Sequence, residues 1–385
     1  MEFVFWSLIS VVMYTYIGYG LLIFVLVKLK RVNNLPIVKY QLPSIVHLIA
    51  AYNEEKDIRK KIKNSLELDY PESKYEVWII TDGSSDKTQE IVKEYKKVRL
   101  FHQDKREGKI HAVNRVMPLI HSEVTVFSDA NTVLNREALK LLVAHYQNKE
   151  VGGVSGEKRI ALEKSDDASS SGEGIYWKYE SFLKKYDYKL YSVVGAAGEL
   201  FSIRTDLYEH IPKDTLIEDF YLTLTIAKKG FRIAYEPNAF ATEKSSSSVK
   251  EESKRKIRIS AGGLQAIWRL RDLLNIVKYG WLSFQFVSHR VLRWTLAPLA
   301  LPVVFIVNLI LALNGQVFYQ VLLFLQITCY LLAFLGWLLQ KQKLKLKILF
   351  VPYYFVFMNI SVYLGFIRLV TGKQSVTWER AERKV

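Results

Sequence analysis

The chain has 385 residues, a formal net charge of +16 and a hydrophobic share of 50%. This length exceeds one small domain, and the single cysteine, Cys329, excludes a disulfide bond within the chain. The basic excess does not indicate nucleic-acid binding, because the Lys and Arg residues form no stripe on a recognisable reader motif. Many of them lie beside long apolar segments instead.

The first predicted element is a membrane helix over residues 3–27. This segment is apolar and uncharged, and at about 1.5 Å rise per residue it can cross a hydrocarbon core of about 30 Å. It is longer than a signal-peptide core and lacks a small-residue cleavage site, so we expect a retained anchor over residues 1–31. The basic residues that follow it indicate a cytosolic end by the positive-inside rule: Lys28, Lys30 and Arg31.

Residues 42–268 have mixed polarity and suffice for one sizeable soluble domain. Short apolar segments alternate there with helical patterns, which predicts an α/β domain with a parallel sheet and helices on both faces. A segment rich in serine, aspartate and glycine at 165–174 reads as a loop. We expect strands at 44–50, 75–80, 98–101 and 124–127, and helices at 54–66, 87–95 and 135–147.

Residues 269–293 mix aromatic and basic side chains, which is typical of interfacial helices along lipid headgroups. Within them, we expect His289 to be a hydrogen-bonded residue and not a catalytic one. Residues 294–369 contain uncharged apolar segments that predict three further membrane helices: 294–313, 317–339 and 348–367.

The basic tail at 370–385 conflicts with this count of membrane helices. If the soluble domain is cytosolic, three crossings place the tail outside, whereas its basic residues favour the inside. Either the last segment stops short of a full crossing, or the tail departs from the positive-inside rule.

Polar residues gather where the predicted strands end. Ligands of parallel sheets bind beyond the carboxyl ends of the strands, and three clusters fall there: residues 53–54, 82–86 and 129–131. One cluster is an ordinary turn, whereas three at successive strand ends indicate a binding site. Asp129 and Asn131 are two residues apart and share one side of an extended turn. Their oxygens suit Mg²⁺ or Mn²⁺ together with a diphosphate and water, and a helix N-cap is the alternative.

Two further pairs of charged residues have an ordinary interpretation when each is taken alone. Glu218 and Asp219 open a predicted helix, where the helix dipole stabilises acids. Arg255 and Arg258 share one face of a helix, as a solvated surface also would.

Taken in order, these motifs resemble the family 2 glycosyltransferases with the GT-A fold. The series reads A-Y-N-E-E, T-D-G-S-S-D, G-K-x-x-A-x-N, D-A-N, G-x-x-G-x-x-x-x-x-R, E-D and R-x-x-R, over about residues 45–263. The membrane-embedded synthases of poly-N-acetylglucosamine, hyaluronan, chitin and cellulose are the most similar members. The resemblance implies an α/β GT-A (Rossmann-like) cytosolic catalytic domain with α-helical transmembrane and interfacial helices.

The resemblance also implies an activity. It implies an inverting hexosyltransferase of the cell membrane that moves a sugar from a nucleotide-sugar, such as a UDP-sugar, to a growing polysaccharide and can pass the product through the membrane. Mg²⁺ or Mn²⁺ is the expected cofactor, and membrane lipids are expected partners. One alternative is the transfer of one sugar to a lipid acceptor. An alternative of another class is an inactive scaffold or transport subunit.

The resemblance assigns roles to single residues. Asp219 is the expected general base, with Glu218 as the next candidate, and Asp129 and Asn131 are the expected metal ligands. Contacts with the nucleotide-sugar are expected from eight residues: Ala51, Asn53, Glu54, Asp82, Lys109, Asp129, Arg255 and Arg258. The sugar and acceptor pocket is expected from five residues: Gly195, Ala196, Ala197, Gly198 and Ile259.

The sequence departs from the family pattern at four positions, one of which is Arg255 in place of the usual Gln. Thr81 replaces the first acid of D-D-G-S, and Asn131 reduces the charge of the metal motif. Ile259 stands where processive synthases place a tryptophan, and isoleucine cannot stack on a sugar ring. Polymerisation then requires Trp268, Trp281 or another aromatic residue as a platform.

The serine-rich segment before the second arginine motif is expected to be a lid. Residues 245–248 are serines, which favour a flexible loop. We predict that residues 243–256 close over bound nucleotide, since their basic side chains attract diphosphate: Lys250, Lys254, Arg255 and Lys256.

Overall fold

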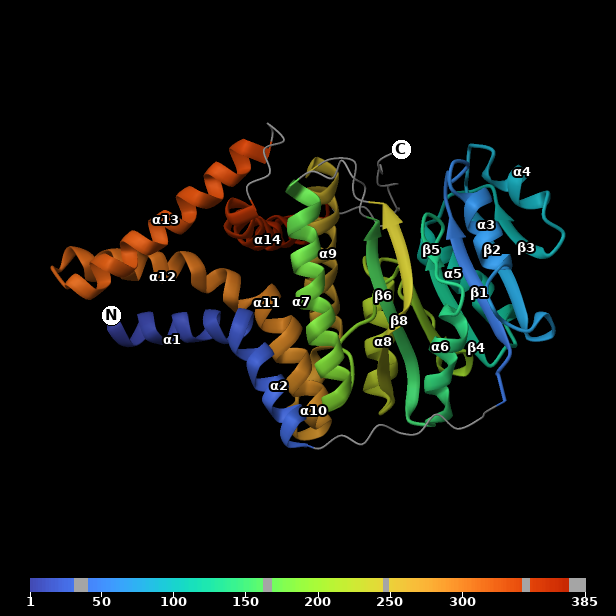
Figure 1. Cartoon of the computed structure of the whole chain (residues 1–385), viewed down its shortest axis with the longest axis horizontal. Coiled ribbons are helices and arrows are strands. Elements are labelled where there is room, and N and C mark those ends of the chain that lie inside the picture. The colour runs from blue at the N-terminus through green and yellow to red at the C-terminus, as the bar shows by residue number, and fades with distance from the viewer. Residues whose placement is uncertain (31–40, 162–167, 245–248, 341–346, 374–385) are drawn as a thin grey trace.

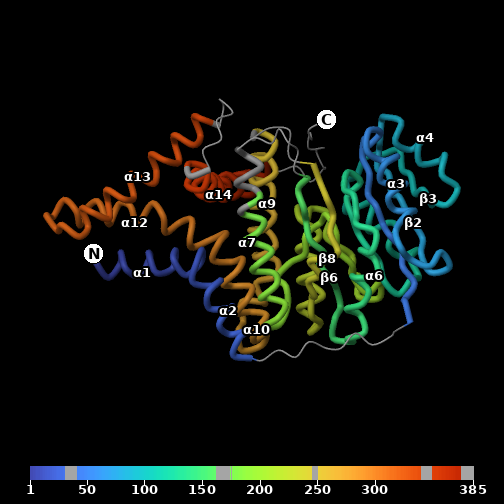
Figure 2. The backbone as a smooth tube through the Cα atoms, in the orientation of Figure 1, coloured from blue at the N-terminus to red at the C-terminus, as the bar shows by residue number. Residues whose placement is uncertain are grey.

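The computed structural model describes residues 1–30, 41–161, 168–244, 249–340 and 347–373. Figure 1 shows an α/β domain on one side and a group of long helices on the other, with α7 (Ala168–Leu190) and α9 (Val249–Arg269) standing between them. The tube in Figure 2 shows the same arrangement of the backbone.

A mixed eight-stranded sheet forms the α/β domain. Its strands lie in this order: β3 (Val98–Gln103), β2 (Tyr75–Asp82), β1 (Ile45–Ala51), β4 (Val124–Asp129), β7 (Leu200–Arg204), β6 (Val151–Ala161), β8 (Arg232–Lys244) and β5 (Val133–Leu134). All seven residues of β1 are buried, as expected of a central strand with both faces covered.

The prediction of a parallel sheet is correct for most of the strands, including the parallel pair β6 and β8, and wrong for β7 and β5, which are antiparallel to their neighbours. β3, β2, β1 and β4 are parallel neighbours, whereas β7 is antiparallel to both β4 and β6. In the β4–β7 pair, Ser128 lies opposite Leu200. The antiparallel direction therefore brings the segment that precedes Leu200 to the edge where β4 ends, beside Asp129.

Helices cover both faces of the sheet, as predicted. Alternate side chains of a strand point to opposite faces, so Ile49 packs with α3 and α4, and Leu48 packs with α5 and α8. The helices of this domain are α3 (Ile58–Leu66), α4 (Thr88–Lys93), α5 (Lys109–Val116), α6 (Ala138–Ala144) and α8 (Glu218–Lys228). Short 3-10 helices occur at Glu72–Lys74, Met117–Leu119, His145–Gln147, Thr205–Leu207 and Arg271–Leu274.

Two predicted loops are largely helical. Residues 168–174 belong to α7 and residues 249–256 belong to α9, so both loop predictions are wrong there. Residues 165–167 and 245–248 lie outside the described residues. The start of α9 is stabilised by ion pairs between side chains three or four residues apart, Glu251–Lys254 at 2.8 Å and Glu252–Lys256 at 3.4 Å.

The structure confirms four helices that are long and apolar enough to cross a membrane among the described residues. The first is built from α1 (Glu2–Met13), a π-helical turn (Tyr14–Gly18) and α2 (Tyr19–Leu29). The other three are α12 (Leu296–Leu313), α13 (Val317–Gln340) and α14 (Lys347–Val370). The predicted interfacial segment contains α10 (Ile276–Phe286), a π-helical turn (Val287–Val291) and α11 (Leu292–Trp294).

The last of these helices, α14, lies against α7 and α9. The ring of Tyr354 lies 5.9 Å from that of Tyr176 on α7. A Cβ atom on Gly365 would lie 2.8 Å from the backbone nitrogen of Ala261 on α9, so glycine permits this close approach. Figure 1 shows α14 nearly end-on beside α9, whereas α12 and α13 extend across the view.

Candidate active site

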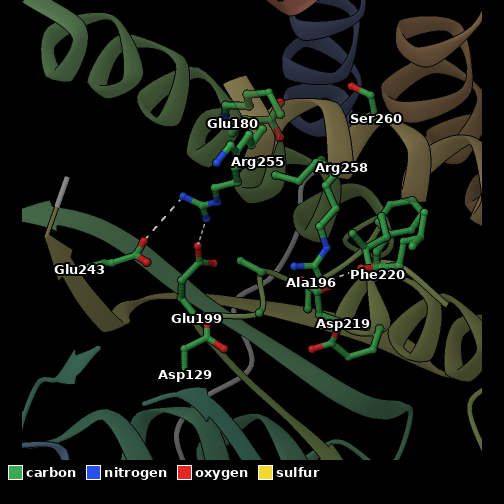
Figure 3. Close-up of a pocket in the computed structure, with 18 of the residues that line it drawn as sticks. Asp129, Glu180, Ala196, Glu199, Asp219, Phe220, Glu243, Arg255, Arg258 and Ser260 are labelled. Atoms are coloured by element: carbon green, nitrogen blue, oxygen red, sulfur yellow. Dashed lines mark hydrogen bonds and ion pairs between the residues drawn. The ribbon is translucent and has the colours of Figure 1, made fainter. Parts of the chain in front are cut away.

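A cavity of about 660 Å³ lies where β1 and β4 end, between the sheet and helices α7 and α9 (Figure 3). It collects most of the residues that the sequence singled out: Glu54, Lys109, Asp129, Asn131, Ala196, Ala197, Gly198, Glu218, Asp219, Arg255, Arg258 and Ile259. These residues come from strand ends, from two helix N-termini and from α9, and only the tertiary fold brings them together.

Lys109 links the strand-end motif to the acidic pair. Its Nζ lies 3.0 Å from Asp129 Oδ1 and 2.6 Å from Glu218 Oε1. Burial acts against the ammonium charge, but the two carboxylates outweigh burial and raise the pKa of Lys109 above its ordinary value. A fixed positive charge therefore lies between two elements that are far apart in the sequence.

Glu218 and Asp219 are neighbours with different pKa values. Burial raises the pKa of Asp219, and the charge of Glu218 raises it further, to about 7. Burial alone would also raise the pKa of Glu218, but Lys109 outweighs burial and lowers it. Glu218 is therefore ionised at neutral pH, whereas Asp219 exchanges its proton near neutrality, as a general base requires.

The glycine-rich segment before β7 packs on the first turn of α8. Gly195 has a φ of +88°, and a Cβ atom there would lie 2.1 Å from Phe220 Cδ2, which leaves glycine as the residue that fits. A Cβ atom on Gly198 would lie 3.2 Å from Asp219 Oδ2. Ala196 N donates to the hydroxyl of Thr223 at 3.1 Å, so this backbone is held against α8.

Four expected site residues do not line the large cavity. Ala51 and Asp82 line a smaller adjoining pocket, which also touches Lys109. The carboxylate of Asp82 accepts backbone hydrogen bonds, including one of 2.6 Å from Gly108 N, and so positions the start of α5. Gly195 supports Phe220, as described above. The direct ligand contacts expected of these residues remain predictions.

Asn53, the fourth of these residues, joins two strand-end loops. It has a φ of +53°, a conformation that asparagine tolerates better than most residues. Its Oδ1 accepts from Ser85 N at 2.8 Å, and its backbone N donates to Ser84 Oγ at 3.2 Å. The T-D-G-S-S-D loop is thereby tied to the end of β1.

Arg255 is held by carboxylates that the sequence analysis missed. Its NH2 lies 2.6 Å from Glu199 Oε1, and Lys158 Nζ lies 2.7 Å from that oxygen and 2.6 Å from Glu243 Oε2 (Figure 3). Burial would raise the pKa of Glu199, but Lys158 and Arg255 lower it well below its ordinary range. The available signal was the charged residue Lys158 within a strand.

Arg258 extends from α9 toward the acidic pair. Its NH2 donates to the backbone oxygen of Leu216 at 3.1 Å. Figure 3 shows its guanidinium directed toward Ala196 and Asp219. It therefore lies beside the start of α8, where a growing negative charge would be stabilised.

The oxygens of the D-A-N motif fit a divalent cation that is shared with a ligand. Asp129 Oδ1 accepts from Lys109, while Oδ2 makes no hydrogen bond in the part of the chain that the structure describes. Asn131 donates through Nδ2 to Glu243, and this bond does not use its Oδ1. Among the described residues, no group of three or more His, Cys, Asp or Glu side chains could hold a metal without further ligands. The ion would then need oxygens from a diphosphate and water.

The aromatic residues that line the cavity differ from Trp268 and Trp281, the two tryptophans considered as a platform for the sugar. Trp268 and Trp281 are exposed and do not line it. The aromatic lining comes from other positions: Tyr176, Trp177, Phe220 and Trp294. His289 is buried, with Nδ1 2.6 Å from Asp187 Oδ2, which agrees with the expected hydrogen-bonded role.

Comparisons with known proteins find similarity to glycosyltransferases in the central region. Residues 47–211 match the family model described as Glycosyl transferase family 2. Over 131 residues the chain is 39% identical to the beta-monoglucosyldiacylglycerol synthase of Trichormus variabilis. This alignment covers 32% of this chain and 28% of that protein. Over 273 residues the chain is 27% identical to the poly-beta-1,6-N-acetyl-D-glucosamine synthase of Staphylococcus epidermidis. That alignment covers 67% of this chain and 64% of that protein. The chain thus aligns with less than two thirds of either relative.

The fold is similar to that of a solved glycosyltransferase. The mannosyltransferase PcManGT from Pyrobaculum calidifontis, in complex with GDP-Man and Mn²⁺, matches with a TM-score of 0.73 and 20% identity. The match covers 96% of this chain and 100% of that structure. This confirms the predicted GT-A fold with its helical flanks.

Proposed function

We propose, from the premise that residues 47–211 form a glycosyl transferase family 2 domain, that the chain transfers a hexose from a nucleotide-sugar to an acceptor at the membrane. The observation that carries this proposal is the contrast between Asp219 and Glu218 in the cavity. One carboxyl exchanges a proton near pH 7, while the other is held ionised against Lys109. An inactive scaffold or transport subunit needs no such pair.

The proposed reaction uses the two sides of the acidic pair differently. Asp219 accepts the proton of the acceptor hydroxyl, and the hydroxyl oxygen bonds to the anomeric carbon of the sugar. The bond between that carbon and the diphosphate breaks, and the diphosphate leaves with the electron pair. Attack opposite to the leaving group inverts the anomeric configuration.

The departing diphosphate gains negative charge and needs cations around it. Lys109 and Arg258 line the cavity and supply fixed positive charge. Asp129 and Asn131 would hold Mg²⁺ or Mn²⁺, which would add charge neutralisation when bound. The nucleoside is proposed to contact Ala51 and Asp82 beside the cavity.

The acceptor is either a growing polysaccharide or a single lipid molecule. The poly-beta-1,6-N-acetyl-D-glucosamine synthase supports the first option, and the beta-monoglucosyldiacylglycerol synthase supports the second. The candidate membrane helices favour the lipid option, because Val317–Leu339 is the least buried of the four. A helix with so much outward surface suits contact with lipid better than the wall of a channel.

The proposed location is the cell membrane, with the catalytic domain in the cytosol, where nucleotide-sugars are made. Basic residues after the first membrane helix support this orientation. Accessory subunits are not part of the proposal.

The function is tested by screening nucleotide-sugars with purified full-length protein in lipid vesicles. Both the release of nucleotide and the length of the product are measured. We expect one donor to be consumed with sugar appearing in a lipid-associated product. Absence of donor turnover across the panel, with folded protein and divalent metal present, would overturn the proposed activity.

A further inference from the structure

One wall of the cavity lies on the side of the candidate membrane helices and takes no part in the proposed donor chemistry. Helix α7 and the end of α14 form this wall, and in Figures 1 and 2 α7 stands between the α/β domain and the long helices, of which α14 is one. The wall contributes these residues to the cavity: Tyr176, Trp177, Glu180, Lys184, Arg368 and Lys373.

Lys184 is a buried lysine on this wall with an unpaired ammonium. Lys184 is only 3% exposed. Its ammonium makes no hydrogen bond or ion pair within the described part of the chain. Its Nζ lies 5.8 Å from the centroid of the Tyr235 ring. Burial lowers the pKa of Lys184, although Glu157 and Glu180 act in the opposite direction. An unpaired buried charge costs free energy that a bound anion would offset.

The carboxylates that line the cavity near this lysine already have cationic partners. Glu180 Oε2 lies 3.1 Å from Arg290 NH1, and Glu199 is held by Arg255, as described above. Neither forms an ion pair with Lys184 at hydrogen-bonding distance. Its ammonium therefore remains available to a ligand inside the cavity.

Two further basic side chains line the same cavity from the end of α14. Neither Arg368 nor Lys373 forms an ion pair or a side-chain hydrogen bond with any described residue. Together with Lys184 they are three cations that line the cavity without an ion pair to any described residue. Such an excess of one charge attracts a ligand of the opposite sign.

The same side of the cavity also offers apolar contacts. Met358 of α14 and Trp294 line the cavity. The outward surface of α14 is apolar and exposed, with Ile360, Phe366 and Ile367 each at least half exposed, which suits contact with lipid chains. A ligand at this wall would therefore meet both cations and a lipid-compatible helix.

We propose that this wall binds the headgroup of a membrane-lipid acceptor that carries both a free hydroxyl and an anionic group such as phosphate. The proposal rests on the function proposed above and adds the chemical class of the acceptor. Lys184, Arg368 and Lys373 pair with the anion, while the hydroxyl faces Asp219. The acyl chains stay beside α14, in contact with the bilayer.

The reaction step is the one described above, with a lipid hydroxyl as the attacking group. Its proton passes to Asp219, its oxygen bonds to the anomeric carbon, and the nucleoside diphosphate leaves with the electron pair. The anionic group of the lipid is not altered. It serves to orient the hydroxyl, as a positioned charge pair does.

The test uses full-length protein in phosphatidylcholine vesicles that contain either phosphatidylglycerol or diacylglycerol at equal mole fraction. Both lipids carry a hydroxyl, and only phosphatidylglycerol is anionic. With the donor found by the screen, the wild type should transfer sugar to phosphatidylglycerol in preference to diacylglycerol. Lys184→Met should raise the KM for phosphatidylglycerol about tenfold, as expected from the loss of one charge-assisted contact, while the KM for the donor stays the same. Lys184→Arg should retain most of the preference.

Lys178→Met is the matched control, because Lys178 is an exposed lysine of the same helix and its loss changes the net charge equally. It should leave both KM values unchanged. Inorganic phosphate should compete with phosphatidylglycerol in the wild type and less so in Lys184→Met.

Separate outcomes contradict separate parts of the proposal. Equal use of the two lipids, or a donor KM that rises in Lys184→Met, would overturn the acceptor assignment while leaving the glycosyltransferase function in place. Competition by phosphate without transfer to phosphatidylglycerol would show that the three cations bind a free anion and would overturn the lipid assignment. Failure of the wild type to turn over any nucleotide-sugar would overturn both proposals.

Discussion

At the level of single residues, Glu218 and Asp219 are adjacent in the chain and differ in what surrounds their carboxyl groups. Glu218 contacts Lys109, while Asp219 faces the glycine-rich segment at Gly198. The ammonium of Lys109 stabilises the charge of Glu218, whereas burial and the charge of Glu218 destabilise a charge on Asp219. The pKa of Glu218 is therefore lowered and that of Asp219 is raised. Roles that require different protonation states can then be carried by one dipeptide.

Asp219→Asn tests the proposed base, because it keeps the shape of the side chain and removes the proton acceptor. We expect turnover to fall by roughly 100-fold or more, with nucleotide binding nearly unchanged. The measurements are steady-state kinetics and equilibrium titration with nucleotide. Wild-type turnover in this variant would move the base to Glu218.

The pKa of Asp219 also predicts the response to pH. The base must be deprotonated, so kcat should rise with pH through about 7. The folded pKa lies above the ordinary value of 3.8, so the folded protein binds this proton more tightly than the unfolded chain. The contribution of Asp219 to stability therefore falls between about pH 4 and 7. Thermal unfolding of wild type and Asp219→Asn at several pH values should show this fall in the wild type alone.

Asp129 tests the proposed metal. Chelation should abolish transfer, Mg²⁺ or Mn²⁺ should restore it, and Asp129→Ala should lose activity while the protein keeps its fold. Circular dichroism and vesicle reconstitution provide the check on folding. Full activity in excess chelator would remove the metal from the mechanism.

At the level of elements, α7 and α9 show how packing overrides local composition. Serine, glycine and charged residues at their starts favour loops when read in isolation. In the fold, α9 packs along α14 through Ala261 and Gly365, and α7 packs against α2 through Leu183 and Tyr19. Burial of these faces stabilises helix where propensity alone does not.

The packing of α14 on α7 and α9 also bears on the position of the C-terminus. Arg368 and Lys373 line the same cavity as Asp219, so the end of α14 lies on the side of the catalytic domain. This arrangement supports the option in which the last apolar segment stops short of a full crossing.

Cysteine labelling tests this topology. The native cysteine is replaced by Cys329→Ser, and Gly372→Cys introduces one thiol just after α14. In sealed vesicles whose catalytic domains face outward, a membrane-impermeant maleimide should label this thiol without detergent, because the end of α14 shares the side of the catalytic domain. Labelling that requires detergent would contradict the arrangement and support a full crossing.

At the level of the whole molecule, the cavity connects the sheet to the membrane side. Its donor end is formed by Lys109 and Asp129, and its other end by α7 and α14. The long helices beyond that end are mostly exposed outward. In the proposed function, a soluble donor and a membrane-borne acceptor would therefore meet from opposite ends of one cavity.

Ile259 tests whether the length of the product is limited by retention of the acceptor. Ile259 lines the cavity, and an aromatic ring there would offer a flat face to the C–H groups of a sugar. If retention limits length, Ile259→Trp should shift products toward longer chains, provided that the larger ring fits. Product sizing by mass spectrometry measures this. A wild-type enzyme and an Ile259→Trp variant that both add one sugar to a lipid would contradict the polysaccharide option.

The sequence by itself determined the class of fold, the four apolar helices and a part of the cavity lining that includes Asp129, Glu218 and Asp219. Buried parallel strands, such as β1, need continuous apolar segments, and helices that can cross a membrane need long uncharged ones, so both leave a local pattern. The tertiary structure decided the antiparallel direction of β7 and β5, the helical starts of α7 and α9, and the ion pairs of Lys158 and Glu199. These features depend on partners distant in sequence, and no local pattern records which strand or carboxylate a residue will meet. The same is true of Lys184, because the tertiary structure determines which side chains surround its ammonium.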